Sequence, residues 1–402
     1  MSKISKAIKH SRAEDWFYCS VWGVSLVVLV NAVLNRIGLA DFTPFTMPII
    51  FTVLFFAGLK QIKSRFRTGD FVFVFFLIFV YALQVLLYPQ NFTNLDAYKD
   101  PVFVIFELFP YFLIGVSLDI NRYYKPFYYI SIVAVFFSLY THLIYAQEVR
   151  GAMEEQEDMV AAYAFLPCYL FTLWGTFKEK NFLGIIASVL GTILLFSFGN
   201  RGTVVCTMFF LTVYFFLSVQ VKKWVLIPVA VILYFIFKYL EPILFFFQTF
   251  MVDIGMSSRV FDSILEDQFL NYESSSGRDS IANALYNALD GGPIFGFGIY
   301  GSNAIVHTYP HNLAIEMWIS FGWIIGSFIL IAIAYLSIKA FLSAHTDEEK
   351  KFLVLMFVIG VFMLFLSSTF MNRPYFFMYL GYCIYLIRNK SKVPQVINEQ
   401  IE

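Results

Sequence analysis

The chain has 402 residues, of which 59% are hydrophobic, 20% aromatic and 14% charged, and its formal net charge is zero. Soluble globular domains are about 45–50% apolar and about 25% charged, so this composition, together with a mean hydropathy of +0.71, excludes a water-soluble globule. A neutral balance also gives no indication of nucleic acid as a partner. We therefore expect a polytopic membrane protein whose single transmembrane domain covers residues 1–402.

The apolar segments are continuous over about 20 residues instead of alternating over about ten, which favours membrane-spanning helices over a barrel and predicts an all-α fold. Each segment has about the length that a bilayer requires, and the last is the shortest. Twelve spans are predicted, near residues 16–34, 43–60, 71–88, 102–119, 126–146, 159–177, 182–199, 202–220, 224–243, 315–338, 352–370 and 375–388.

The basic residues predict the orientation. If the N-terminus is cytoplasmic, all but eight of the 28 lysines and arginines fall on the cytoplasmic side, as the positive-inside rule requires. The eight others are Arg36, Lys99, Arg150, Arg201, Lys238, Arg259, Arg278 and Arg373. Both termini are then cytoplasmic and the number of spans is even. The first apolar run has no small-residue cleavage pattern, so we interpret it as a retained span and not as a signal peptide.

The four cysteines all fall inside apolar spans and form no C-x-x-C pair, which indicates neither a disulfide framework nor a zinc site. The longest segment outside the predicted spans is a loop at residues 244–312 on the outer side. Within it, Ile281, Leu285 and Leu289 recur at helical spacing, which predicts a short amphipathic helix from Asp279 to Leu289 on the membrane surface. Long loops in compact proteins are usually functional or disordered, and this periodicity argues against disorder.

A glycine-rich stretch at residues 291–301 follows this helix and predicts a bent, irregular backbone. Pro310 then precedes the apolar run that begins at Leu313, which predicts a helix that starts beside His311. A histidine in the first turn of a helix lies at the positive end of the macrodipole, which disfavours imidazolium and leaves the ring available as a base.

Two arginines are candidates for binding an anion at the outer face. Arg201 lies in a tight turn between two apolar runs, and Arg278 opens the amphipathic helix after Ser276-Gly277. Buried guanidinium groups are costly unless they meet an anion, but Arg201 could equally snorkel to the headgroups and Arg278 could be a solvated loop charge. Arg259 and Arg373 are weaker candidates of the same kind.

The polar residues around His311 are also candidates. Asn312 could bind substrate or form a satisfied polar pair with His311, and Glu316, one turn further on, could orient either side chain or solvate the helix start. His307 is interpreted as a loop residue. The sequence contains no P-loop, no H-E-x-x-H and no G-x-S-x-G motif. No metal site and no cofactor are expected.

Five features follow one another along the chain. They are Arg201-Gly202 between two spans, Ser276-Gly277-Arg278 in a large outer loop, Gly296-Phe297-Gly298, Pro310-His311-Asn312 at a helix start, and Gly322 with Gly326. In this order they resemble the O-antigen polymerase and O-antigen ligase superfamily of bacterial membrane glycosyltransferases, which have the C-type architecture. The resemblance covers about residues 185–340, and the first half of the chain matches only as a series of spans.

The resemblance implies transfer of a glycan from an undecaprenyl diphosphate carrier to an acceptor hydroxyl, at the periplasmic face of the bacterial inner membrane and without a nucleotide sugar or metal. Arg201 and Arg278 would hold the diphosphate, and a neutral His311 would accept the hydroxyl proton, with inversion at the anomeric carbon. The implied partners are the lipid-linked glycan donor and acceptor, membrane lipid and a protein that regulates chain length.

We interpret the chain as a polymerase that joins lipid-linked repeat units into O-antigen or a capsule-like polysaccharide. An O-antigen ligase, which transfers glycan to the lipid A core, would use the same residues and remains an alternative. A polysaccharide or solute transporter is an alternative from another class, although transporters usually place charged residues near the midplane of broken helices in two related halves. Here the candidate residues gather at one face and no halves repeat.

Overall fold

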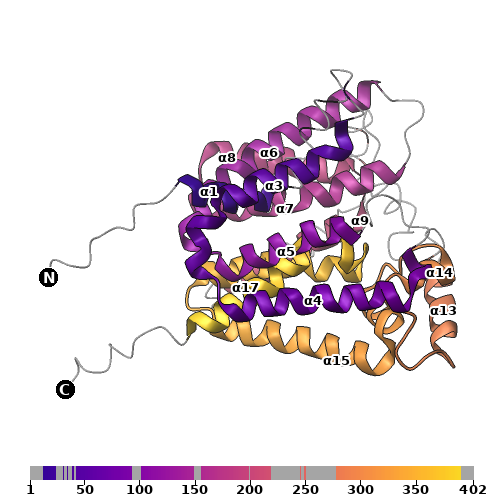
Figure 1. Ribbon diagram of the computed structural model, residues 1–402. Coiled ribbons are helices and arrows are strands. Elements are labelled where there is room, and N and C mark those ends of the chain that lie inside the picture. The colour runs from indigo at the N-terminus through magenta and orange to yellow at the C-terminus, as the bar shows by residue number, and fades with distance from the viewer. Residues whose placement is uncertain are drawn as a thin grey trace.

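A computed structural model of the chain describes residues 12–23, 42–92, 101–148, 155–198, 200–218 and 278–390, with a few isolated positions between them (Figure 1). This part of the chain is all-helical and contains no strand, as the apolar segments predict. Its elements are α1 (Arg12–Cys19), η1 (Ser20–Trp22), α3 (Thr43–Ile62), η3 (Lys63–Arg65), α4 (Thr68–Leu87), η4 (Pro89–Phe92), α5 (Pro101–Ser117), α6 (Ile120–Glu148), α7 (Glu155–Glu179), α8 (Phe182–Ser197), α9 (Arg201–Ser218), α13 (Arg278–Leu289), α14 (Gly301–Val306), α15 (Leu313–Ser343), α16 (Asp347–Gly360), η6 (Phe362–Phe365), η7 (Phe370–Asn372) and α17 (Pro374–Lys390).

Three of the described helices, α4, α9 and α15, are long and apolar enough to cross a membrane. They coincide with three of the predicted spans. The span near residues 224–243, most of the one near 16–34, and residues 250–277 of the large loop lie outside the described residues. The count of twelve therefore stays a prediction. The predicted span at residues 352–370 differs from the structure, because α16 ends at Gly360 and short 3₁₀ turns follow it.

Helices α5 and α17 cross at close range through a pair of glycines. A Cβ atom added to Gly115 would collide with the backbone of Met378 and Tyr382, and one added to Gly381 would collide with the backbone of Phe112. Small residues at such crossings allow backbones in membrane bundles to approach closely. Helices α5 and α17 therefore pack backbone to backbone at this crossing.

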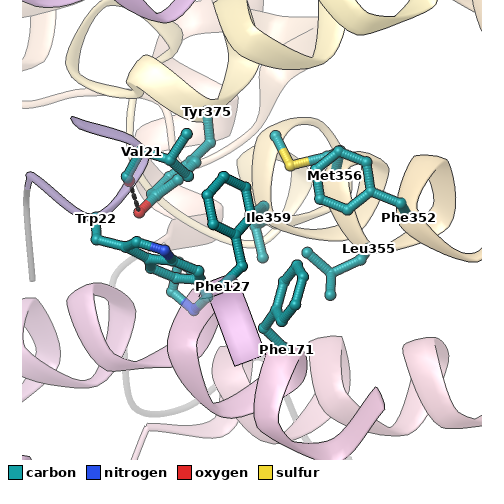
Figure 2. A pocket seen from close by; sticks show the side chains of 10 residues that line it. Val21, Trp22, Phe127, Phe171, Phe352, Leu355, Met356, Ile359 and Tyr375 are labelled. Atoms are coloured by element: carbon teal, nitrogen blue, oxygen red, sulfur yellow. Dashed lines mark hydrogen bonds between the residues drawn. The ribbon is translucent and has the colours of Figure 1, made fainter. Parts of the chain in front are cut away.

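The core beside these helices is mostly aromatic. Figure 2 shows a small cavity between Trp22, Phe127, Phe171 and Phe352, where Tyr375 donates a hydrogen bond to the carbonyl oxygen of Val21 at 3.2 Å. Its lining presents no polar surface, so it does not suit a sugar or a phosphate.

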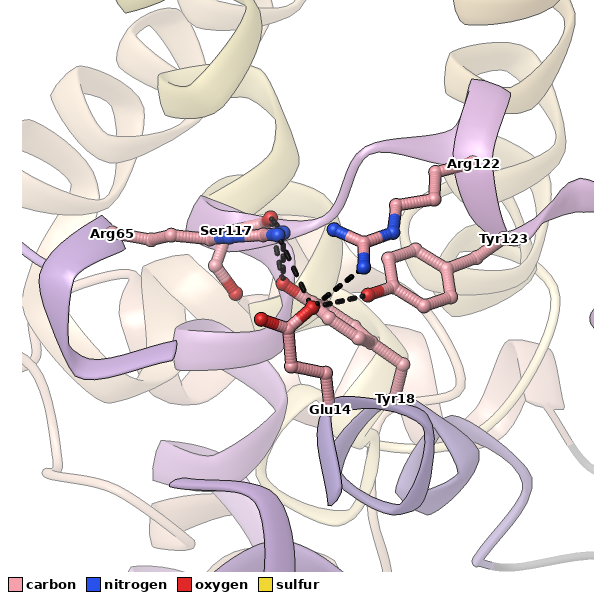
Figure 3. Close-up of polar contacts among 6 residues, drawn as sticks. All are labelled: Glu14, Tyr18, Arg65, Ser117, Arg122 and Tyr123. Atoms are coloured by element: carbon pink, nitrogen blue, oxygen red, sulfur yellow. Dashed lines mark hydrogen bonds and ion pairs between the residues drawn. The ribbon is translucent and has the colours of Figure 1, made fainter. Parts of the chain in front are cut away.

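Charged side chains join the helix ends at one end of the bundle. Figure 3 shows the carboxylate of Glu14 between Arg122, at 2.9 Å, and Arg65, at 3.5 Å, with the hydroxyl of Tyr123 donating to the same oxygen at 3.3 Å. Arg65 also donates to the hydroxyl of Tyr18 at 2.9 Å. These bonds connect α1, the α3–α4 turn and the start of α6. Buried charges are stable only when they are paired in this way.

The same end holds the start of α4 and the end of α17, because Asp70 forms an ion pair with Arg388. The other end of α4 contacts the glycine-rich loop: Asn91 of η4 donates to the carbonyl oxygens of Phe297 and Ile299 at 2.8 and 3.0 Å. Helix α4 thus connects the two ends of the bundle. In Figure 1, α1 and the end of α17 lie on the left, and α13 and α14 lie on the right.

The glycine-rich loop has the bent backbone that its composition predicts. Gly291, Gly296 and Gly298 have φ values of 84°, 75° and 84°, in the left-handed region that side chains disfavour. Tyr88 donates to the carbonyl oxygen of Gly296 at 3.3 Å. The loop is therefore an ordered part of this end of the bundle.

Helix α15 is not the continuous span that residues 315–338 predict. At Gly322 the backbone has φ 76° and ψ 166°, and the chain turns back on itself. After the turn, a Cβ atom on Gly326 would lie 2.6 Å from the carbonyl oxygen of Met317, and Trp318 donates from Nε1 to Ser327 at 3.0 Å. Residues nine apart in a straight helix are about 13 Å apart along its axis. Residues 313–321 therefore form a short helix across the end of the bundle, and residues 323–343 form the membrane-length part.

The amphipathic helix predicted from Asp279 to Leu289 is α13, but its apolar face does not lie on a membrane surface. Leu285 and Leu289 are buried against Ile315 and Ile319 of the short helix. Because residues 313–321 fold across the end of the bundle, they cover the face that the periodicity assigned to lipid.

Candidate functional site

The candidate residues within the described ranges come from the starts of α9, α13 and α15 and from the segment that joins η6 to α17. We call this segment, residues 366–373, the 366–373 connection. Arg278 and Glu316 each form a hydrogen bond to it, and Arg373, its last residue, donates to Ser368 within it. Arg259 lies outside the described residues.

Arg278 is the first residue of α13 and is partly buried. Its Nη1 donates a hydrogen bond to the carbonyl oxygen of Leu366 at 3.0 Å. A guanidinium group has five donors in a planar fork, and this backbone bond helps to orient it. The bond therefore fixes the charge of Arg278 beside the 366–373 connection.

His311 lies just before α15 and not in its first turn. Its φ is 55°, and Asn312, not His311, is the residue that begins the helix. The prediction that His311 lies in the first turn is therefore wrong, because His311 and Pro310 both precede the helix. The imidazole lies 4.1 Å from the Tyr309 ring, centroid to centroid.

The imidazole of His311 is neutral for a different reason from the one expected. Burial, and after it the positive charge of Arg278, lowers the pKa of His311 from 6.5 to about 4. Its Nδ1 is buried and has no hydrogen-bond partner among the described residues. A neutral ring with an unused nitrogen can accept a hydrogen bond or a proton.

Asn312 has a structural role that needs no substrate. Its side-chain oxygen accepts hydrogen bonds from the backbone amides of Ala314 and Ile315, at 2.9 and 3.4 Å. This is the capping arrangement that asparagine favours at a helix start. The cap fixes the direction in which the chain leaves His311.

Glu316 orients neither His311 nor Asn312 with its carboxylate. It is buried and accepts hydrogen bonds from the hydroxyl of Thr369 and from the backbone amide of Phe370, the latter at 3.2 Å. A buried carboxylate is costly without such donors. Glu316 therefore ties the 366–373 connection to the short helix that follows His311.

Arg201 is the first residue of α9, and the turn before it is capped by Asn200. The side-chain oxygen of Asn200 accepts from the amides of Gly202 and Thr203 at 2.9 and 3.3 Å. Tyr163 of α7 packs against this turn, because a Cβ atom on Gly202 would collide with its hydroxyl oxygen. Arg201 thus begins a helix whose first turn is held by a residue from the first half of the chain.

Arg373 also contacts Tyr163. Its guanidinium lies 5.0 Å from the centroid of the Tyr163 ring, within cation–π range, and its Nε donates to Ser368 at 2.8 Å. Ser368 has φ 75°, so the connection bends sharply at this serine. Tyr163 therefore links the Arg201 turn to the 366–373 connection, and the structure gives Arg373 more weight than its sequence context did.

Tyr163 and the run Ser367-Ser368-Thr369 are the residues that the sequence analysis missed. The run carried a signal, since three consecutive hydroxyl residues end a predicted span just before Arg373. Tyr163 carried none, because it is one of 25 tyrosines in the chain and lies inside an apolar segment. His307 directly follows α14, with a φ of 57°, and is the loop residue that the sequence predicts.

The arrangement combines permanent positive charge with a neutral base. The charge of Arg278 acts on His311. The 366–373 connection contains Arg373, accepts a hydrogen bond from Arg278 and donates hydrogen bonds to Glu316. Tyr163 contacts both this connection, at Arg373, and the turn before Arg201. Guanidinium groups bind phosphate oxygens in a bidentate manner. In the part of the chain that the structure describes, no three His, Cys, Asp or Glu residues gather as a metal site would require.

Comparison of the chain with protein-family models, with curated proteins and with solved structures found no match in any of the three. The functional proposal therefore depends on the residues of this chain, on their geometry and on the resemblance of their order to the glycosyltransferase superfamily.

Proposed function

We propose that this chain is an integral-membrane glycosyltransferase that joins undecaprenyl-diphosphate-linked oligosaccharide repeat units into O-antigen or a capsule-like polysaccharide. The observation that carries the proposal is the pairing of Arg278 with a neutral His311, at the end of the bundle where Arg201 and Arg373 also lie. A transfer from a diphosphate needs positive charge for the leaving group and an unprotonated base for the acceptor.

The reaction follows from these groups. The acceptor hydroxyl attacks the anomeric carbon of the donor glycan, and His311 accepts the hydroxyl proton as the new C–O bond forms. The bond between that carbon and the diphosphate oxygen breaks, and the diphosphate leaves with the electron pair. Direct attack opposite the leaving group inverts the anomeric centre. His311 then releases its proton to water.

Arg201 and Arg278 have the role of holding the diphosphate, and Arg373 adds to the positive field. Electrostatic stabilisation of developing negative charge is worth most in a site that excludes water. The 366–373 connection and the Asn200 cap keep these arginines in fixed positions, which avoids reorganisation during the reaction. In this proposal, Asn312 and Glu316 hold the backbone around His311 and the 366–373 connection in place. Arg259 stays a candidate for substrate binding.

The proposed location is the bacterial inner membrane, with both termini in the cytoplasm and the site facing the periplasm. Support comes from the distribution of charge in the bundle. Arg65, Arg122 and Arg388 gather at the end opposite to Arg278, as the positive-inside rule predicts for a cytoplasmic side. Partners in this setting are the two lipid-linked glycans, membrane lipid and a chain-length regulator protein.

The decisive experiment is the lipopolysaccharide banding of a strain that lacks this gene. A single repeat unit on the lipid A core is the result expected for a missing polymerase. Bare core with accumulated lipid-linked polymer would assign the chain as the ligase instead. Unchanged banding and unchanged capsule, with wild-type levels of lipid-linked intermediates, would contradict both glycosyl-transfer functions.

A further inference from the structure

The exposed apolar surface of residues 323–343 forms a single stripe. Ile324, Phe328, Ile331, Tyr335, Ile338 and Leu342 are each at least 60% exposed and recur every three or four residues. Such a stripe on one helix is what lipid contact requires, and on a soluble protein it would be an aggregation site. The stripe begins at Trp323, directly after the turn at Gly322.

The stripe continues beyond the helix onto the glycine-rich loop. The carbonyl group of Ile294 lies directly against Gly322, so the Ile294-Phe295 turn borders Trp323. Ile294 is 71% exposed and Phe295 is 68% exposed, although both are large apolar residues. Two adjacent apolar side chains at the tip of an ordered turn cost free energy in water, at about 25 cal/mol per Å² of apolar surface.

Aromatic rings with polar tips cover the same corner. The rings of Tyr286 and Trp323 stack at 6.3 Å with an interplanar angle of 14°, and the ring of Trp318 lies 4.6 Å from that of Trp323. Tyrosine and tryptophan are enriched at the level of the lipid headgroups, because one side of the ring is apolar and the other is polar. We call Tyr286, Ile294, Phe295 and Trp323 the aromatic corner.

Apart from Tyr286, the exposed positions of α13 and of the residue after it carry polar side chains. Asp279, Asn283, Asn287 and Asp290 are exposed, while the apolar face of the helix is buried in the protein. Exposed polar residues therefore flank Tyr286 along α13. Polar side chains beside an amphipathic ring suit the boundary between acyl chains and water.

We propose that the aromatic corner is a membrane-interface anchor, in which Ile294 and Phe295 insert into the acyl-chain boundary of one leaflet while Tyr286 and Trp323 lie among the headgroups. The partner is the lipid bilayer itself. The anchor sets the height of the short helix 313–321, and hence of His311, relative to the membrane surface. This inference does not depend on the proposed glycosyl transfer.

Spin labels on single cysteines can measure the depth of the corner. The full-length protein carries Cys19→Ser, which removes the one free cysteine among the four that is not buried. Nitroxide labels are attached in separate variants at Ile294→Cys and Phe295→Cys, in vesicles of phosphatidylethanolamine and phosphatidylglycerol. Collision with oxygen reports lipid, and collision with a water-soluble nickel complex reports water. Phe328→Cys is the lipid control and Asp290→Cys the water control.

The ratio of oxygen to nickel collisions at positions 294 and 295 is expected to lie between the two controls and above the value at position 290. A ratio equal to that at position 290 would place the turn in water and overturn the proposal. Low collision with both reagents would also overturn it, because a protein partner or a second copy would then cover the corner. Both native side chains are largely exposed, so the cysteine variants are expected to fold.

Discussion

The positive charge of Arg278 acts on the imidazole of His311: burial, and after it this charge, lowers the pKa of the ring to about 4. A permanent cation and an unprotonated base are therefore neighbours at neutral pH. Two charged groups of the same sign would repel each other, and a protonated histidine could not accept a proton. In the proposed reaction, Arg278 would supply charge for the diphosphate and His311 a base for the acceptor hydroxyl.

Removal of the base should stop catalysis without loss of protein. His311→Gln and His311→Ala are expected to accumulate in the membrane and to lower kcat by about a hundred- to ten-thousand-fold, the usual contribution of a general base. The measurement is turnover of purified lipid-linked repeat units. His345→Ala is the control, since His345 lies in the α15–α16 turn at the far end of the bundle and should keep wild-type turnover. Turnover of His311→Ala within a few-fold of wild type would remove the base from the mechanism.

The pH profile should report the environment of His311. Its folded pKa of about 4 leaves the ring neutral above about pH 5, so the acid limb of kcat/KM is expected well below 6.5. Arg278→Gln removes the second cause of the shift and leaves burial, so the limb should move upward while staying below 6.5. Arg278→Lys keeps the charge and should keep the limb, although loss of the bidentate fork should raise KM. An acid limb of kcat/KM that stays at the wild-type pH in Arg278→Gln would show that the charge of Arg278 does not lower the pKa of His311.

Stability should follow the same shift. The pKa of His311 is about 6.5 in the unfolded chain and lower in the folded one, so between these values the unfolded state binds more protons. The contribution of the neutral His311 to the free energy of unfolding is therefore fully present above about pH 6.5 and is lost as the pH falls towards about 4. His311→Gln should lose less thermal stability over this window than wild type.

The bond between Glu316 and the 366–373 connection should be measurable as coupling. Glu316→Ala leaves the Thr369 hydroxyl and the Phe370 amide without their acceptor, and an unsatisfied buried group costs about 1–3 kcal/mol. Thr369→Val removes one of the two donors. In a double-mutant cycle monitored by thermal unfolding in detergent, the two changes should together cost less than the sum of their separate costs. Strict additivity would show that the two residues do not interact.

The contact between Tyr163 and Gly202 gives a compensation test. Gly202→Ala places a methyl group against the Tyr163 hydroxyl oxygen, so it should displace the Arg201 turn and lower activity. Tyr163→Phe removes that oxygen but keeps the ring beneath Arg373. The double variant is therefore expected to recover activity that Gly202→Ala alone loses. Tyr169→Phe, which removes a hydroxyl bonded to Thr192 of α8, should not restore Gly202→Ala.

The turn at Gly322 should tolerate no side chain. Gly322→Ala would need a left-handed backbone at φ 76° and would collide with the carbonyl group of Ile294. Loss of the turn would displace the short helix that carries Asn312 and Glu316, so protein level and melting temperature should both fall. Gly69→Ala is the control, because a Cβ there meets nothing within 4 Å. A Gly322→Ala variant as stable as Gly69→Ala would contradict the fold-back.

The sequence by itself determined the class of the protein and the identity of most candidate residues. Continuous apolar segments must be helical in a membrane, because no water is present there to satisfy backbone amides and carbonyls. The glycine-rich loop and the residues around His311 carry local signals, since positive φ angles and helix starts depend on neighbours in the chain. These features were predictable because their causes lie within a few residues.

Only the tertiary structure decided which residues meet. Apolar periodicity in α13 could not distinguish lipid from protein, and residues 313–321 cover it because Gly322 reverses the chain. Glu316 bonds to Thr369, and Arg373 lies over Tyr163, although long stretches of sequence separate each pair. Contacts of this kind depend on how whole helices pack. The 366–373 connection therefore became recognisable as the link between the candidate residues only in the folded bundle.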